Sequence, residues 1–163
     1  TSLRIQNRWI ISTLFLILAI LLLIGLSFYK NIKTVDLSSA SINGIHLNEQ
    51  FHKKDFNVNK NIKVDRYTFY NHKKYDDLTV KVHKKKHVVK GIVLVKDKEI
   101  HTNFGVRIGS HIDEVINDLG SNYQKSKIGK NYQSITYRDR EHHMKLSILY
   151  KDDIVKRIEF FSK

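Results

Sequence analysis

The longest apolar run of the chain lies near its start, from Trp9 to Tyr29, and contains no charged residue. A helix rises about 1.5 Å per residue, so a run of this length matches the roughly 30 Å hydrocarbon core of a bilayer. Trp9 and Phe28-Tyr29 place amphipathic rings at the two ends, where membrane interfaces favour them. The pattern predicts a transmembrane helix over residues 9–29, after a short tail at residues 1–8.

A cleaved signal peptide is the alternative interpretation of this run. Its apolar region would span about 7–15 residues and would end at a small-x-small cleavage site. The run here is longer, and Leu26-Ser-Phe-Tyr-Lys30 offers no such site. The sequence therefore favours an uncleaved anchor, followed by a tether at residues 30–41 and a soluble domain at residues 42–163.

The basic residues beside the run give little guidance on its orientation. Arg4 and Arg8 precede the run, and Lys30 and Lys33 follow it, so the count behind the positive-inside rule is nearly balanced. The short N-terminal tail is the easier part to leave inside. We expect a single-pass protein of the cell membrane with a cytoplasmic N-terminus and an extracytoplasmic domain. A domain that faces inward is the alternative.

The order of apolar and polar positions after residue 41 occurs twice along the chain. The similar pairs are residues 42–47 with 103–108, 67–70 with 135–137, 78–82 with 144–148, and 88–92 with 154–158. Several of these segments alternate with period two, which is typical of half-buried strands. Self-similarity of this kind predicts two tandem units, at about residues 42–96 and 101–163.

Each unit is predicted to pack a short helical segment on an antiparallel sheet of three to four strands, an α+β fold. In the second unit, Ser110 is a good N-cap, apolar residues follow at helical spacing, and Gly120 is placed to end the helix. In the first unit, residues 48–56 have a weaker pattern, so we expect a short or frayed helix there. The other face of the sheet would be half exposed.

The run from Gly105 to Gly120 resembles the G-x-x-x-G-x-x-x-x-x-V-x-x-x-L-G unit of several exported bacterial domains. One is the N-terminal domain associated with CAP/SCP-type secreted proteins, whose first unit has a pattern similar to Tyr67–Asn71 and Val89–Ile92. The others are the small outer-membrane-assembly lipoproteins and the β-lactamase-inhibitor-protein-like fold. The resemblance covers residues 42–161, with Asn48 in place of the first unit's second glycine. It implies a protein-binding fold without catalytic residues.

The composition excludes several kinds of site and gives the chain a positive net charge. The chain has no cysteine, which excludes a disulfide, a thiolate nucleophile and a thiolate metal site. It has 29 Lys and Arg against 16 Asp and Glu, for a net charge of +13, and the excess is greatest between His52 and Lys90. A basic surface attracts phosphate polymers, anionic lipids and nucleic acid alike. A solvated, lysine-rich surface is the plain alternative.

The titratable residues form no catalytic or metal-binding motif. His142 and His143 are adjacent in a strand-like segment and would point to opposite faces, and three lysines lie between His83 and His87. The aspartate pairs at 76–77 and 152–153 fall in predicted turns. No nucleophile elbow, phosphate-binding glycine loop or zinc motif is present. We expect no catalytic residue, no metal and no cofactor, and thus a protein that is not an enzyme.

These features favour a membrane-anchored extracytoplasmic module that binds a protein of the cell envelope, as a regulator, inhibitor or scaffold. Recognition residues would lie on the exposed sheet face, and alternation favours Tyr67, Tyr70, Lys81, Tyr137, Arg138 and Lys145. The second hypothesis is an electrostatic binder of anionic envelope polymers or lipid headgroups, with contacts from Lys84, Lys85 and Lys86. The third, an inward-facing nucleic-acid binder, requires the opposite topology.

Overall fold

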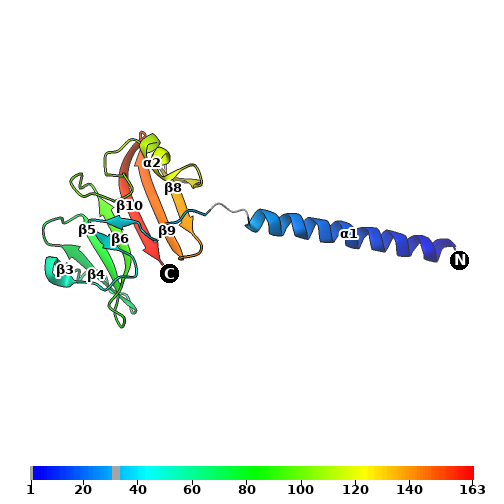
Figure 1. Cartoon of the computed structure of the whole chain (residues 1–163), viewed down its shortest axis with the longest axis horizontal. Coiled ribbons are helices and arrows are strands. Elements are labelled where there is room, and N and C mark those ends of the chain that lie inside the picture. The colour runs from blue at the N-terminus through cyan, green and yellow to red at the C-terminus, as the bar shows by residue number, and fades with distance from the viewer. Residues whose placement is uncertain (1, 31–33) are drawn as a thin grey trace. The chain divides into compact units, whose positions relative to one another are not determined.

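The computed structural model describes residues 2–30 and 34–163, and the side chains of residues 7–28 and 34–163. The chain divides into two compact units, an N-terminal helix and a folded domain that begins at Thr34 (Figure 1). The strands of the described chain all belong to the domain.

Helix α1 runs from Ser2 to Lys30 and confirms the helix that the apolar run predicts. Its stretch from Asn7 to Phe28 has a mean hydropathy of 2.8 and is long and apolar enough to cross a membrane. None of this stretch is buried, so large side chains such as Leu14, Phe15 and Leu23 are exposed. A helix whose whole surface is apolar is expected to lie in a protein core or in a membrane.

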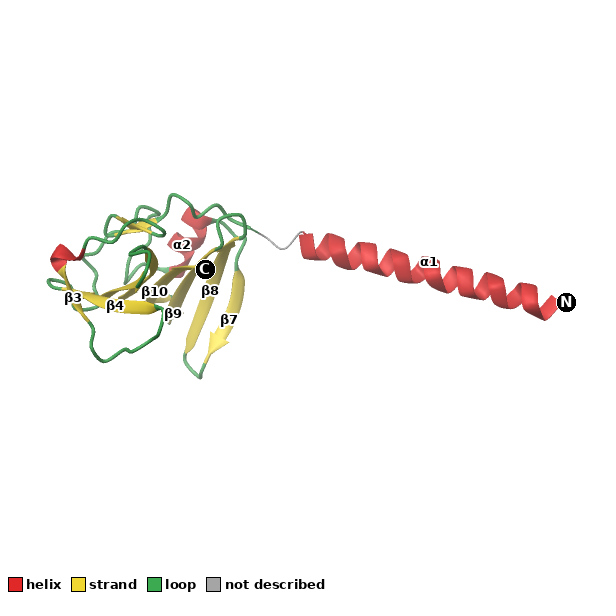
Figure 2. Ribbon diagram, turned by 90° about the horizontal axis from the view of Figure 1, so that it is seen from below, coloured by secondary structure: helices red, strands yellow, loops and turns green. Residues whose placement is uncertain are grey.

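The domain is built on one antiparallel sheet of eight strands (Figure 2). In spatial order the strands are β3 (Phe56–Val58), β4 (Tyr67–His72), β5 (Leu78–His83), β6 (Val89–Val95), β10 (Ile154–Ser162), β9 (Met144–Lys151), β8 (Tyr132–Asp139) and β7 (Gln124–Ile128). A separate ribbon is formed by β1 (Ser41–Ile42) and β2 (Ile45–His46). The helical segments of the domain are a 3-10 turn at Lys53–Asp55 and helix α2 (Ile112–Leu119).

The sheet is continuous because β6 pairs with β10 at its centre. In this antiparallel pair, Ile92 lies opposite Phe160 and Leu94 lies opposite Ile158, and all four side chains are fully buried. The α+β class and the antiparallel pairing are as predicted. The sheet size is different, since one sheet of eight strands replaces two sheets of three or four.

The hydrophobic core lies on one face of this sheet. On β5, Leu78, Val80 and Val82 are buried while the residues between them are half-buried, which confirms the predicted alternation. Helix α2 and most of the loops lie over the core face (Figure 2). No helix or strand of the domain covers the opposite face.

Helix α2 forms where the sequence predicts it, but a different residue caps it. His111 Nδ1 accepts a hydrogen bond from the Asp113 N–H at 3.2 Å, while the Ser110 hydroxyl accepts one from the Arg107 N–H. Gly120 ends the helix with a φ of 87° and donates its N–H to Ile116 O. The predicted end is therefore confirmed, and the predicted N-cap is wrong by one residue.

The helix expected over residues 48–56 is reduced to the 3-10 turn. The backbone of this segment is bonded to the β5–β6 hairpin instead, with Asn48 N–H donating to Val89 O and Phe51 N–H donating to His87 O. Asn48 also has a φ of 66°, outside the helical region. These groups are not available for helical hydrogen bonds, so no longer helix forms.

Residues 34–41, predicted as part of a tether, belong to the folded domain. Leu37 is only 2% exposed, and the Val35 N–H donates to Arg138 O at 2.9 Å. Burial of Leu37 and Ala40 gives this segment a hydrophobic reason to pack. Of the rest of the predicted tether, Lys30 ends helix α1, and residues 31–33 lie outside the described residues.

Candidate functional site

The uncovered face of the sheet, called the open face below, has a defined row of side chains at its centre. Strand pairing places Phe69, Lys81, Gly91, Phe161, Lys145 and Arg138 opposite one another across six neighbouring strands. Alternate side chains of a strand point to opposite faces, and the neighbours of this row, such as Val80, Ile92 and Phe160, are in the core. The row therefore lies on the open face.

Aromatic rings and a lysine pack together in this row. The ring of Phe161 lies across Gly91, where any side chain would overlap it. Lys81 Nζ is 4.0 Å from the centre of the Tyr67 ring and 5.7 Å from that of Phe161. Tyr67 also meets His83 edge to face at 5.7 Å. Cation–π contacts of this kind hold an ammonium group against an aromatic floor.

The row and Tyr67 together form a basic-aromatic patch, defined here as Tyr67, Phe69, Lys81, Phe161, Lys145 and Arg138. Lys145 and Arg138 are exposed, whereas Lys81 is half-buried among the rings. The neighbouring carboxylate, Glu159, is engaged by Arg157, whose Nε donates to Glu159 Oε1 at 2.6 Å. The patch therefore offers unneutralised positive charge beside apolar rings.

Four of the six predicted recognition residues lie in this patch, namely Tyr67, Lys81, Arg138 and Lys145. Tyr70 and Tyr137 do not, because each is an odd number of positions from Tyr67 or Arg138 in its strand and so points to the other face. Tyr70 packs on Phe51 with ring centres 4.6 Å apart. The placement of these two tyrosines on the exposed face is wrong.

Tyr137 is a core residue with no exposed surface. Its hydroxyl donates to Gly120 O at 2.7 Å, which ties β8 to the end of helix α2. Burial, together with the neighbouring Tyr123, raises the pKa of Tyr137 to about 12. The ring therefore stabilises the fold and is not accessible to a partner.

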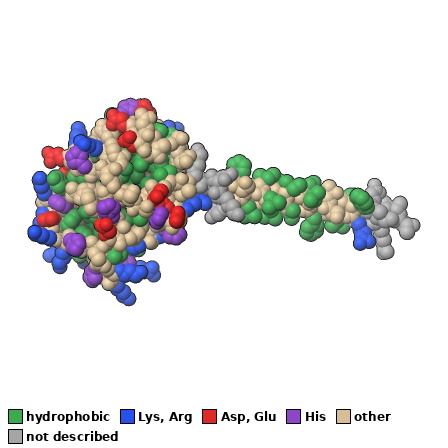
Figure 3. All heavy atoms as spheres, in the orientation of Figure 1, with side chains coloured by type: hydrophobic (Ala, Val, Ile, Leu, Met, Phe, Trp, Pro, Cys, Tyr) green, Lys and Arg blue, Asp and Glu red, His purple; other side chains and the backbone are tan. Residues whose placement is uncertain are grey.

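Lys84, Lys85 and Lys86 form the exposed turn between β5 and β6, as predicted. The Lys84 ammonium donates to Val64 O at 2.8 Å, and His83 Nδ1 accepts from the N–H groups of Lys85 and Lys86. On the side of the domain drawn in Figure 3, Lys and Arg are scattered, with Asp, Glu and His among them. The turn is thus an exposed basic tip at one end of the β5–β6 hairpin.

Sequence reasoning missed Phe69, Gly91 and Phe161. Gly91 carried a usable signal, because a glycine inside a strand often marks a close approach. Phe161 could not be assigned to a face without the register of β10, which shifts by one residue between Val155 and Arg157.

A cavity of about 660 Å³ opens at the end of the sheet where β10 begins. Its lining is mostly apolar and includes Val95, Leu149 and Ile154, together with three lysines. Val95 and Leu149 both pair with Arg157 in the sheet, so the cavity continues the open face beyond the basic-aromatic patch. The sequence contained no local signal for it, because its residues come from distant segments.

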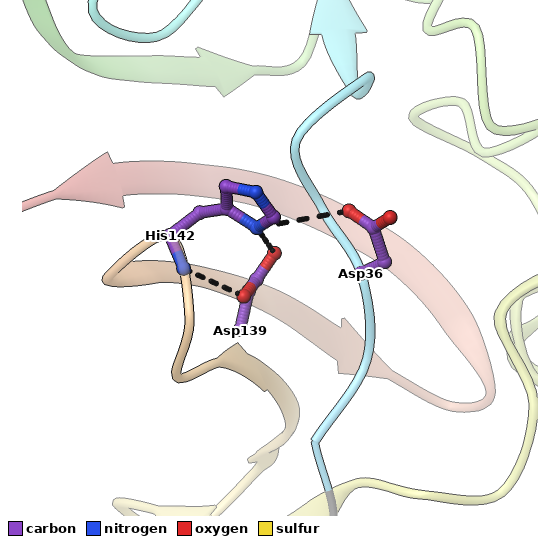
Figure 4. A group of neighbouring side chains, drawn as sticks. All are labelled: Asp36, Asp139 and His142. Carbon is purple, nitrogen blue, oxygen red and sulfur yellow. Dashed lines mark hydrogen bonds and ion pairs between the residues drawn. The ribbon is translucent and has the colours of Figure 1, made fainter.

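Asp36, Asp139 and His142 form the one group of carboxylate and imidazole ligands among the described residues that is close enough to share a metal ion (Figure 4). The Asp139 carboxylate already accepts hydrogen bonds, from the Leu37 N–H at 2.8 Å, the His142 N–H at 2.9 Å and His142 Nδ1 at 2.8 Å. Asp36 accepts from the Ser38 N–H and hydroxyl. The group therefore fastens residues 36–37 to the β8–β9 turn.

Asp139 and His142 change each other's pKa. Burial acts to raise the pKa of Asp139, but hydrogen bonds from His142 and Leu37 outweigh burial and leave this pKa below its usual value. The hydrogen bond to Asp139 raises the pKa of His142. The hydrogen bond between them therefore stabilises the ionised form of Asp139 and the protonated form of His142.

Comparison of the chain with protein-family models, with curated proteins and with solved structures finds no match. The resemblance to tandem exported domains therefore stays an expectation.

Proposed function

We propose that this chain is a membrane-anchored, non-catalytic module that binds a protein of the cell envelope through the open face of its sheet. Helix α1 holds the module in the membrane, with the N-terminus inside and the domain outside. Bound to its partner, the module acts as a regulator, inhibitor or scaffold.

The observation that carries this proposal is the basic-aromatic patch on an uncovered sheet face. Aromatic residues and arginine are enriched in protein interfaces, and the residues that dominate binding energy lie in well-packed, desolvated positions. Phe161 and Lys81 are half-buried and held by their neighbours, so little conformational freedom is lost when a partner covers them.

The positions of the shifted titratable groups support binding over catalysis. Tyr137 and Asp139 have clear pKa shifts, but Tyr137 ties β8 to α2 and Asp139 fastens the segment after the anchor. Catalytic acids and bases combine a shifted pKa with access to a substrate. Neither residue lies on the open face.

We further propose that the sheet derives from two tandem units, β3–β6 and β7–β10. The strand order 3-4-5-6-10-9-8-7 supports this, because each set of four runs from an edge to the centre in chain order. The β6–β10 pair then joins the two sets. This arrangement gives the open face contributions from both units.

The second candidate function is electrostatic binding of anionic envelope polymers or lipid headgroups by Lys84, Lys85 and Lys86. The exposure of all three residues in one turn favours it. Such binding is lost at high salt, because released counterions drive it.

The test is co-purification of crosslinked partners from intact cells that express the full chain. Exchange of Lys81 and Lys145 for glutamate should reduce recovery of a specific protein by about tenfold or more, because interface centres dominate affinity. Exchange of Lys54 and Lys125, which lie outside the patch, makes the same charge change and should leave recovery unaltered. Equal loss in both variants would contradict the proposal, and loss only on neutralising residues 84–86 would favour the second candidate.

A further inference from the structure

We propose that the cavity beside β10 binds a single-chain lipid anion, an alkyl chain that ends in a carboxylate or phosphate. This inference does not depend on the protein-binding role of the patch, because a separate set of residues carries it.

The floor and walls of the cavity fit an alkyl chain. Val95 and Leu149 lie on the strands on either side of Arg157, and Ile154 lies before Arg157 at the start of β10. Ile128 and Tyr132, which face each other across the β7–β8 hairpin, line the cavity and are each 43% exposed. Apolar side chains on two sides are therefore open to solvent, and covering them is favourable.

The size of the cavity fits a small ligand. Pockets that hold small molecules have volumes of about 300–1,000 Å³, and this one has about 660 Å³. It is also part of a concave region between the hairpin and the loop that leads into α2, as Ile108 and Gly109 are among its lining residues.

The edge of the cavity fits an anion. Lys96, Lys98 and Lys156 line it and are exposed, and no carboxylate is among the described lining residues. The fourth cation, Arg157, already pairs with Glu159 at 2.6 Å. Three ammonium groups around an apolar floor complement a ligand that has one charged end and one apolar end.

A ligand that has only an apolar chain or only an anionic group would contact only part of the cavity. A neutral apolar molecule would bring no charge to the three lysines, and inorganic phosphate would leave Leu149 and Ile128 in water. Each methylene that enters the cavity should strengthen binding by about fourfold at most, because it removes apolar surface from water.

The test is a titration of the full chain in nanodiscs of zwitterionic lipid, with the free probe concentration fixed by equilibrium dialysis. The probes are octyl phosphate and octanoate, and the comparators are octyl glucoside and inorganic phosphate. Methyl NMR signals of Val95, Leu149 and Ile154 should shift and saturate with the two anionic probes, and the stronger of these identifies the head group. Hexyl phosphate, which lacks two of the methylenes, should bind more weakly than octyl phosphate, by about fifteenfold at most.

Charge variants separate the site from general attraction. Lys98→Gln with Lys156→Gln should weaken octyl phosphate binding by about tenfold, the size of one or two charged hydrogen bonds. Lys130→Gln, in the β7–β8 turn outside the cavity, should not change it. The methyl spectrum of each variant reports whether the domain remains folded.

Three results would overturn the inference: no saturable shift at the cavity methyls, equal shifts with octyl glucoside, or equal weakening by Lys130→Gln. Failure of the protein-binding proposal would be seen instead as unaltered partner recovery after exchange of Lys81 and Lys145. The two outcomes are therefore distinguishable.

Discussion

Among single residues, Gly91 matters most for the packing of the open face, because it has no side chain. The ring of Phe161 occupies the space that a Cβ at this position would need. Lys81 then approaches both that ring and Tyr67. One glycine therefore determines how the centre of the patch is packed.

Gly91→Val should displace the Phe161 ring and destabilise the domain by about 1–3 kcal/mol, the usual cost of overpacking. Chemical denaturation measures this cost, and the ring signals of Phe161 report the displacement. In a Phe161→Ala background the same substitution should cost much less, because the overlap is gone. Equal costs in the two backgrounds would show that the ring does not depend on Gly91.

The Asp139–His142 pair predicts a pH dependence. The pKa of His142 is raised in the folded state, so its contribution to stability is full below the unfolded value of about 6.5 and is lost as pH rises through the folded value. The pKa of Asp139 is lowered, so its contribution is present above the unfolded value and is lost as pH falls through the folded value. The contact between Asp139 and His142 therefore stabilises the fold most at pH values above the unfolded pKa of Asp139 and below the unfolded pKa of His142.

His142→Gln should therefore remove part of the fall in unfolding free energy as pH rises above about 6.5. Urea denaturation at several pH values across this window measures it. His143→Gln is the matched control, because no interaction with Asp139 involves the His143 side chain in the described structure. If both variants retain the wild-type pH profile, the imidazole of His142 does not stabilise the fastening.

At the element scale, the pairing of β6 with β10 makes the eight strands one sheet. Ile158 lies in this central pair, opposite Leu94 on one side and Ile148 on the other, and has no exposed surface. The two ends of the sheet should therefore unfold together.

Ile158→Ala should cost about 2–5 kcal/mol, the range for a truncated buried side chain, and should lower the single unfolding midpoint of the whole domain. Val58→Ala, at the exposed edge strand β3, should cost far less. Denaturation followed by signals from β4 and from β8 measures both. Two separate transitions would mean that each half of the sheet is an independent unit.

Much of the fold could be predicted at this scale, because strands with one buried face alternate. The segments at 78–82, 88–92, 144–148 and 154–158 all form strands as expected. Strand β7 carried no such pattern, since all five of its residues are exposed. The joining of β6 to β10 depends on contacts between distant segments, which no local pattern contains.

The candidate site was predictable only in part for the same reason. Alternation places Lys81 correctly but fails for Tyr70 and Tyr137, because it does not tell which of two neighbouring positions faces solvent. A tyrosine can occupy either a buried position, as Tyr137 does, or a position on the open face, so the residue type alone does not tell which face it is on. Only the register of the strand pairs distinguishes the two kinds of position.

For the whole molecule, we predict a topology with the N-terminus inside and the domain outside. The chain has no cysteine, so Lys85→Cys introduces a single thiol in an exposed turn of the domain. A membrane-impermeant maleimide should label this variant on intact cells. A cysteine in place of Thr1, before the helix, should be labelled only after the membrane is opened. The reverse pattern would place the domain inside and favour the nucleic-acid alternative.

The proposed function requires one protein partner to cover the open face of the membrane-anchored domain. Its most direct test is photo-crosslinking on intact cells, with benzoylphenylalanine in place of Phe69 or Lys145 in the patch and, as a control, in place of the exposed Lys53 in the 3-10 turn. We expect both patch positions to capture the same protein and the control position not to capture it. Capture of unrelated proteins from the two patch positions, or equal capture of one protein from Lys53, would contradict it.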